Sequence, residues 1–305
     1  MLIKLVDKIS IPGGLYNEDI ANAVSNAAWV IDGSNGLDPQ VFSSSDSDGK
    51  WYAEMLDKYL LENISNQSIC LQEIVLQAIT FMYEEYKKFT GDDHIEELNH
   101  PSAGISLVRW YKDKLEYFVM GDCQIWLKDY RNIKVISDYK VASLNEKVIL
   151  ALKENMQQGF SHEDAIKNVQ SLIVENRNKC NKINGYWGLN FNRIAVYHGV
   201  SGKIKYGKEH NYLEILLATK GFYAITECYK KMHEAEVFKF AKSKGLNEVG
   251  IYIRNVEEAD KDFRKYARIQ KSEDTSAVYI DFEKAPIIPI DKSNNAFIKK
   301  GRYMV

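Results

Sequence analysis

The stretch from residue 17 to residue 36, NEDIANAVSNAAWVIDGSNG, constrains the fold most, because an unbroken apolar run ends in a charged residue. The run at 27–31 is bounded by turn residues, a pattern typical of a buried strand. Asp32 then lies where that strand reaches the surface, and Gly33 lets the backbone approach another group closely. A carboxylate in such a place is costly unless it is paired or binds a metal ion.

Two further carboxylates, Glu18 and Asp19, lie on a polar loop upstream, and the chain between is long enough for a hairpin to bring them beside Asp32. Clustered carboxylate oxygens suit a hard cation such as Mg²⁺ or Mn²⁺. The alternative is that Asp32-Gly33 is a hairpin turn and Glu18-Asp19 a solvated loop, and the pattern alone leaves both interpretations open.

The composition is that of an ordinary globular protein of 305 residues, with 45% apolar and 27% charged residues. A net charge of -2 gives no basic field that would recruit nucleic acid or a membrane surface. No window approaches the apolar length of a membrane span, and the start MLIKLVDKIS is too short and too charged for a signal peptide. We therefore expect a cytoplasmic protein with neither nucleic acid nor a membrane as partner.

The cysteines and histidines show no spacing typical of a site. The four cysteines are scattered without a CxxC pair, which indicates reduced thiols and argues against structural zinc. The six histidines show no HExxH spacing, so each is expected to be packed or solvated.

Apolar periodicity predicts helices and short strands in separate groups. The predicted strands are 2–6, 27–31, 105–108, 115–119, 124–127, 133–136, 193–197, 213–218 and 275–282. The predicted helices are 51–64, 71–82, 144–158, 162–179, 233–244 and 255–270, with Ser161 capping the fourth and Gly245 ending the fifth.

Grouped helices favour an α+β fold in which two antiparallel sheets stack face to face with helices outside. No linker composition interrupts the chain, so we predict one domain over 1–283. The tail at 284–305 is either an arm packed on the domain or a flexible end.

Charged residues beside a glycine recur at strand ends. VMGD ends at Asp122, ILLATKG carries Lys220, and Glu273-Asp274 precedes the last strand. Such a recurrence is the layout expected of a site at one rim of a pair of sheets.

The order NED, WVIDGSNG, SAGISLV, VMGDCQIWL, NGYWGL, ILLATKGFYAI and SEDTSAVYIDF resembles the metal-dependent protein phosphatases of the type 2C (PPM) family. It is most similar to their compact bacterial branch, in which a segment such as 185–189, GYWGL, is familiar. The resemblance runs from about residue 10 to residue 283 and implies a four-layer αββα sandwich, in agreement with the fold predicted from the pattern.

The resemblance also implies roles for individual residues. Asp32 matches the aspartate that bridges two Mg²⁺ or Mn²⁺ ions, and Gly33 the glycine whose carbonyl binds one of them. Glu18 matches a carboxylate on that same ion, and Asp19 a neighbouring carboxylate that positions the attacking water.

Two later aspartates complete the implied site. Asp274 matches a ligand of the other ion, and Asp122 the aspartate linked to a third, weaker metal. The implied reaction is attack of metal-activated hydroxide on the phosphorus of phosphoserine or phosphothreonine, with no covalent phospho-enzyme.

Two departures from the family pattern bear on activity. Lys220 stands where the family has a metal-binding aspartate, and an ammonium group has no acceptor with which to bind a cation. Gly14 stands where animal members of the family place a phosphate-binding arginine.

These residues lead to two main hypotheses. The first is a phosphatase acting on a phosphorylated partner protein, such as a substrate of a serine/threonine kinase; the second is a catalytically impaired phosphatase fold that binds a partner. Hydrolysis of a small phosphorylated metabolite stays open, as does the oligomeric state. We expect the ammonium of Lys220 within a few ångströms of Asp32 or Asp274, and at most one well-held ion, on the side of Glu18, Asp32 and Gly33.

Overall fold

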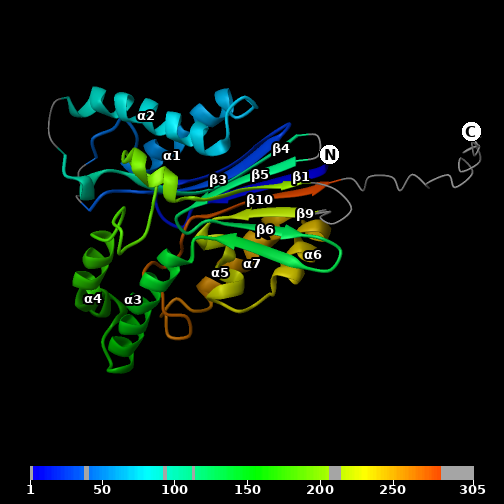
Figure 1. Ribbon diagram of the computed structural model, residues 1–305. Coiled ribbons are helices and arrows are strands. Elements are labelled where there is room, and N and C mark those ends of the chain that lie inside the picture. The colour runs from blue at the N-terminus through cyan, green and yellow to red at the C-terminus, as the bar shows by residue number, and fades with distance from the viewer. Residues whose placement is uncertain (1–2, 38–40, 92–94, 112–113, 206–213, 283–305) are drawn as a thin grey trace, which may run out of the picture.

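The computed structural model describes residues 3–37, 41–91, 95–111, 114–205 and 214–282 (Figure 1), and the predicted tail at 284–305 lies outside them. The described strands form two antiparallel sheets of five strands each. The first sheet, in spatial order, contains β1 (Ile3–Ile11), β10 (Thr275–Phe282), β9 (Glu214–Ala218), β6 (Gln124–Lys128) and β7 (Ile133–Ser137). The second contains β2 (Asp19–Val24), β3 (Ala27–Ser34), β4 (Ser102–Tyr111), β5 (Lys114–Met120) and β8 (Val200–Lys205).

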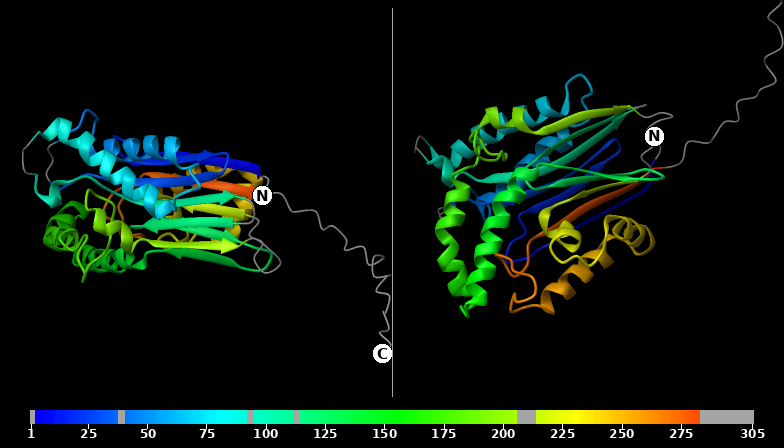
Figure 2. Two further views of the ribbon diagram at one scale, coloured as in Figure 1. Left: turned by 45° about the horizontal axis from the view of Figure 1, so that its top comes forward. Right: turned by 60° about the horizontal axis from the view of Figure 1, so that its bottom comes forward.

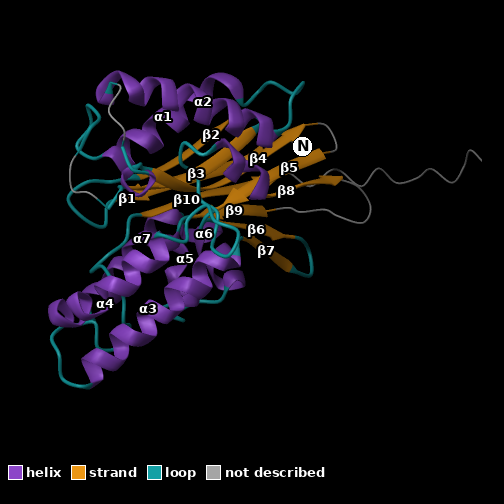
Figure 3. Ribbon diagram, turned by 60° about the vertical axis from the view of Figure 1, so that its left-hand side comes forward, coloured by secondary structure: helices purple, strands orange, loops and turns teal. Residues whose placement is uncertain are grey.

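Helices cover the outer face of each sheet, as Figures 1 and 3 show. The second sheet carries α1 (Asp48–Asn63) and α2 (Leu71–Thr90), and the first carries α5 (Lys220–Glu227), α6 (Glu234–Lys244) and α7 (Leu246–Glu258). The hairpin of α3 (Tyr139–Gln157) and α4 (His162–Arg177) projects beyond one end of the sheets (Figure 2). The predicted α+β sandwich of four αββα layers is confirmed. Within the described ranges, no helix is both long and apolar enough to cross a membrane.

The apolar run at 27–31 forms the centre of β3, where both faces of the strand are covered. Trp29 and Ile31 belong to the core beneath α1 and α2, whereas Ala28 and Val30 belong to the core between the two sheets. Because successive side chains of a strand point to opposite faces, burial on both faces requires an apolar residue at every position.

Three predicted elements differ from the structure. Residues Asp19–Val24 form β2 rather than a polar loop, and Arg193–His198 form a 3₁₀ helix (η2) rather than a strand. The last helix, α7, covers only residues 255–258 of the predicted helix at 255–270, and residues 259–270 are irregular. The short helix α5, a second 3₁₀ helix (η1, Glu97–Asn99) and strand β8 were not predicted, whereas the caps at Ser161 and Gly245 are confirmed.

A buried ion pair joins the second sheet to the loop between α1 and α2. The guanidinium of Arg109 on β4 donates to the carboxylate of Glu116 on β5, and both side chains are almost wholly buried. It also donates to the carbonyls of Ile64, Asn66 and Ile69 at 2.6–3.0 Å. The charge is tolerated inside because its donors have partners on both elements.

Replacing Arg109 by methionine should therefore destabilise the fold by about 3–5 kcal/mol, because it leaves Glu116 and three carbonyls without their donor. Urea unfolding followed by circular dichroism measures the loss. Lys203→Met, which removes the exposed second partner of Glu116, is the control and should cost less than about 1 kcal/mol. Equal losses of unfolding free energy for the two variants would show that the buried ion pair contributes no more to stability than the exposed one.

Candidate active site

The β2–β3 hairpin brings two of the predicted site residues side by side. Asp19 and Asp32 are paired across the two strands, and the amide of Gly33 donates to the carbonyl of Glu18 at 3.1 Å. A Cβ on Gly33 would lie 2.5 Å from the carbonyl oxygen of Gly49 and 2.6 Å from that of Glu18, so only glycine fits there. The hairpin thus fixes the spacing of the first three carboxylates.

Asp122 lies close to Asp32 because two of the residues around it are glycines, which have no side chain to keep the two carboxylates apart. Gly104 on β4 pairs with Asp32, and a Cβ on Gly104 would lie 3.1 Å from Oδ1 of Asp122. The turn that delivers Asp122 contains Gly121, whose positive φ of 76° favours glycine. Burial, together with the charges of Asp19 and Asp122, raises the pKa of Asp32 well above its usual value.

A hydrogen bond across the sandwich holds Asp19. The hydroxyl of Thr219, which follows β9 of the first sheet, donates to Oδ2 of Asp19 at 2.7 Å and accepts the amide of Ser276 at 3.0 Å. The other oxygen, Oδ1, is buried and has no hydrogen-bond partner among the described residues. Burial raises the pKa of Asp19 well above its usual value.

Both carboxylate oxygens of Asp274 accept hydrogen bonds from backbone amides. Oδ1 accepts the amide of Gly13 at 2.6 Å, and Oδ2 accepts the amide of Glu18 at 2.7 Å. The carboxylate thereby ties the segment before β10 to the loop that leads into β2.

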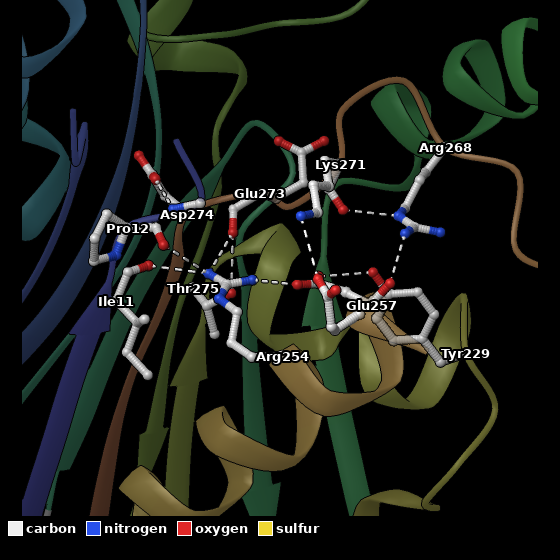
Figure 4. A network of polar contacts seen from close by, with 12 residues as sticks. Ile11, Pro12, Tyr229, Arg254, Glu257, Arg268, Lys271, Glu273, Asp274 and Thr275 are labelled. Atoms are coloured by element: carbon white, nitrogen blue, oxygen red, sulfur yellow. Dashed lines mark hydrogen bonds and ion pairs between the residues drawn. The ribbon is translucent and has the colours of Figure 1, made fainter. Parts of the chain in front are cut away.

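Arg254 on α7 supports the same segment from below, as Figure 4 shows. Its Nη2 donates to the carbonyls of Ile11, Pro12 and Glu273, and its Nη1 donates to the carboxylate of Glu257 at 2.6 Å. One side chain therefore fixes both loops that Asp274 connects.

Lys220, whose ammonium is predicted to lie within a few ångströms of Asp32 or Asp274, has Glu273 as its ion-pair partner at 2.9 Å. Asp274, the residue after Glu273, accepts two backbone amides. Lys220 still senses the cluster, because the charges of Glu273, and less strongly Asp122 and Asp32, raise its pKa.

A cleft of about 400 Å³ lies at the rim of the sheets, and Asp19 is not among the residues that line it. Its walls include Glu18, Asp32, Gly33, Asp122, Lys220, Glu273 and Asp274. Gly14 also lines it, and a Cβ there would meet no atom within 4 Å, so the position expected to carry a phosphate-binding arginine is open space.

The cleft is also lined by Arg177, the last residue of α4. The guanidinium of Arg177 was not predicted from the sequence. Its Nη2 donates to the carbonyl of Asn35 at 2.7 Å and to the hydroxyl of Ser102 at 2.9 Å. No local pattern marks Arg177, since only the folded hairpin of α3 and α4 brings position 177 beside β3 and β4.

The donor set fits one divalent ion better than two. Within the described ranges, no group of three or more His, Cys, Asp and Glu side chains is disposed to hold a metal ion. Both oxygens of Asp274 are engaged, and Oε1 of Glu18 accepts from Asn35 and Ser47. Within the described ranges, Oδ1 of Asp19 has no hydrogen-bond partner, and a hydrated Mg²⁺ or Mn²⁺ needs few protein ligands.

No protein-family model matches the sequence, and no curated protein matches it. Solved structures do match. The serine/threonine phosphatase PstP/Ppp of Mycobacterium tuberculosis is 11% identical with a TM-score of 0.55, over 93% of this chain and 100% of that chain. Stp1 of Staphylococcus aureus is 10% identical with a TM-score of 0.55, over 93% and 96%. The catalytic domain of PstP in complex with two manganese ions is 12% identical with a TM-score of 0.51, over 92% and 99%.

These likenesses span nearly the whole of each chain, so this protein has the fold of the bacterial PPM serine/threonine phosphatases. At such low identity the likeness concerns the fold, and the roles of individual residues remain predictions.

Asp32→Asn should stabilise the metal-free protein by about 1 kcal/mol, because it removes a charge that burial and two neighbouring carboxylates disfavour. It should also abolish the rise in melting temperature that Mn²⁺ gives the wild type. Thermal unfolding with Mn²⁺ and with a chelator measures both effects.

The matched control is Asp57→Asn on α1, whose carboxylate accepts from the indole of Trp29 at 2.7 Å and from Asn22 at 3.0 Å. There the same change should destabilise the protein by about 1–3 kcal/mol. Destabilisation by Asp32→Asn as well would point to a purely structural carboxylate.

Proposed function

We propose that this chain is a PPM-type phosphatase that hydrolyses phosphoserine or phosphothreonine in a partner protein with the help of Mg²⁺ or Mn²⁺. The observation that carries the proposal is the convergence, on one cleft, of carboxylates and cations from widely separated segments of the chain. Carboxylates that raise one another's pKa are a typical preparation for a divalent cation, and guanidinium and ammonium groups suit phosphoryl oxygens.

In this proposal, Asp32, Glu18 and the carbonyl of Gly33 hold the ion. When bound, the ion lowers the pKa of water and offsets the negative charge on the phosphoryl oxygens. Oδ1 of Asp19, which is buried and has no hydrogen-bond partner among the described residues, would accept a hydrogen bond from the attacking water and take its proton. Thr219 keeps the Asp19 carboxylate in place by its hydrogen bond to Oδ2.

Arg177 takes the role of phosphate anchor that Gly14 lacks. Three protons of its guanidinium are used on Asn35, Ser102 and Ser34, which orient the group while leaving other N–H donors for a phosphoryl oxygen. Arg177 and Lys220 both lower the pKa of Asp122, although burial raises it overall, so both cations lie within electrostatic reach of this carboxylate.

A second candidate function is a catalytically impaired phosphatase fold that binds a phosphoprotein. The Lys220–Glu273 ion pair and the engaged Asp274 favour it, since together they replace the ligands of a second ion. One ammonium offsets a single charge and cannot activate water. Both candidates agree in expecting a turnover well below that of a complete binuclear site.

Lys220→Asp should therefore increase Mn²⁺-dependent hydrolysis of a phosphothreonine peptide by about tenfold or more, because it restores an oxygen ligand and frees Glu273. Phosphate release over a Mn²⁺ titration measures the effect. Lys220→Met, which removes the cation without adding a ligand, is the matched control and should gain little.

High wild-type turnover that falls on introduction of aspartate would reject the impaired enzyme and leave the active phosphatase. Absence of Mn²⁺-dependent hydrolysis in the wild type and in Lys220→Asp would reject the phosphatase.

Arg177→Met should raise KM for p-nitrophenyl phosphate about tenfold, because a charge-assisted hydrogen bond to the phosphoryl group is lost. Steady-state kinetics separates this from an effect on kcat. Arg193→Met, at an exposed arginine of η2, is the control. Equal KM values for the two variants would remove Arg177 from the phosphate site.

A further inference from the structure

A second cavity of about 270 Å³, here called the side cavity, lies next to the cleft between α3, α4 and the end of β3. Its walls are mainly aliphatic and aromatic: Leu37, Val141, Leu144, Val148, Ile173, Tyr186 and Ile269. Arg177 and Tyr186 line both spaces, so the side cavity continues the cleft. Its volume suits one side chain better than a whole small-molecule ligand.

One residue that lines the side cavity, Asn176, carries a polar atom without a partner among the described residues. Asn176 is 7% exposed, and its Nδ2 donates to the carbonyl of Leu144 at 3.0 Å, which fixes the orientation of the amide. Its Oδ1 is buried and has no hydrogen-bond partner within the described ranges. Buried acceptors are normally paired, so this oxygen suits a donor brought in by a ligand.

The order of the residues relates the two spaces. Asn176 and Arg177 are neighbours at the end of α4, so a group bound by the guanidinium lies close to a group bound in the side cavity. Adjacent residues of a peptide have Cα atoms about 3.8 Å apart, so both spaces are within reach of consecutive residues.

We propose that the side cavity binds an aliphatic side chain of a residue adjacent to the phosphorylated serine or threonine, with a peptide N–H of the substrate donating to Oδ1 of Asn176. This inference rests on the proposed function and adds a substrate preference to it. An acidic neighbour is disfavoured because aliphatic walls offer a carboxylate no compensation for lost hydration.

The test compares phosphothreonine peptides that carry leucine, alanine or aspartate on either side of the phosphoresidue. For one of the two sides, the wild type should prefer leucine over aspartate by about tenfold or more in kcat/KM. Leu144→Trp, which fills the side cavity from a residue that does not line the cleft, should abolish this preference. It should also lower the ratio of peptide turnover to p-nitrophenyl phosphate turnover. Leu150→Trp on the same helix, 57% exposed and outside the cavity, is the matched control.

Equal turnover of the leucine and aspartate peptides by the wild type, or a preference that survives in folded Leu144→Trp, would overturn the inference. Should neither p-nitrophenyl phosphate nor any peptide be hydrolysed, the proposed function fails. The side cavity is then tested by fluorescence anisotropy with labelled phosphopeptides, where tighter binding of the leucine peptide supports it and equal affinity rejects it.

Discussion

The cleft depends on how the carboxylate of Asp274 is satisfied. By accepting the amides of Gly13 and Glu18, it joins the segment before β10 to the loop before β2, and so joins the first sheet to the second at their rim. A carboxylate with two backbone donors has a hydrogen-bond partner on each oxygen without any metal ion. The same satisfaction leaves it little capacity to act as a metal ligand.

The residue before Asp274 is also held by contacts with other elements. While Asp274 accepts the two amides, the preceding Glu273 pairs with Lys220, and Arg254 donates to the carbonyl of Glu273. The ion pair gives the acidic cluster one permanent positive charge. Asp32 and Asp19 remain the carboxylates whose charge is least compensated, as their raised pKa values indicate. Buried carboxylate charges of this kind are expected to lower the stability of the fold until a cation binds. Binding of a cation then restores that stability.

The sequence predicted the layers of the fold well because they follow from burial. The run at 27–31 had to be covered on both faces, and grouped helices had to lie outside stacked sheets. Local side-chain bonds explain two of the failures. Asn192 accepts the amide of Ile194 and turns an apolar run into a 3₁₀ helix. Asp260 accepts the amides of Lys265 and Tyr266, which folds a helix-like pattern into a loop.

The site was predictable only where its residues lie next to a strand end. Asp32 lies near the end of β3, Asp122 follows β5 and Asp274 precedes β10, and such positions meet at a sheet rim. The hairpin of α3 and α4 has no such rule, because its position is set by packing against Ile269, a residue about a hundred positions later in the chain. Arg177 and the partner of Lys220 were therefore beyond reach of a pattern-based argument.

Charge placement in the cleft is asymmetric, and this asymmetry bears on the chemistry it can support. On the side of Asp19 and Asp32, Oδ1 of Asp19 has no partner among the described residues, whereas on the other side Asp274 accepts two amides and Glu273 pairs with Lys220. A divalent ion gains most where charge is uncompensated, because binding there relieves repulsion as well as forming bonds. An ion on the other side would have to displace Lys220 or two backbone amides, and would lose the Lys220–Glu273 pair or the connection between the loops. The connection between the loops and a second ion would thus both use the carboxylate of Asp274. In this chain the carboxylate makes the connection between the loops.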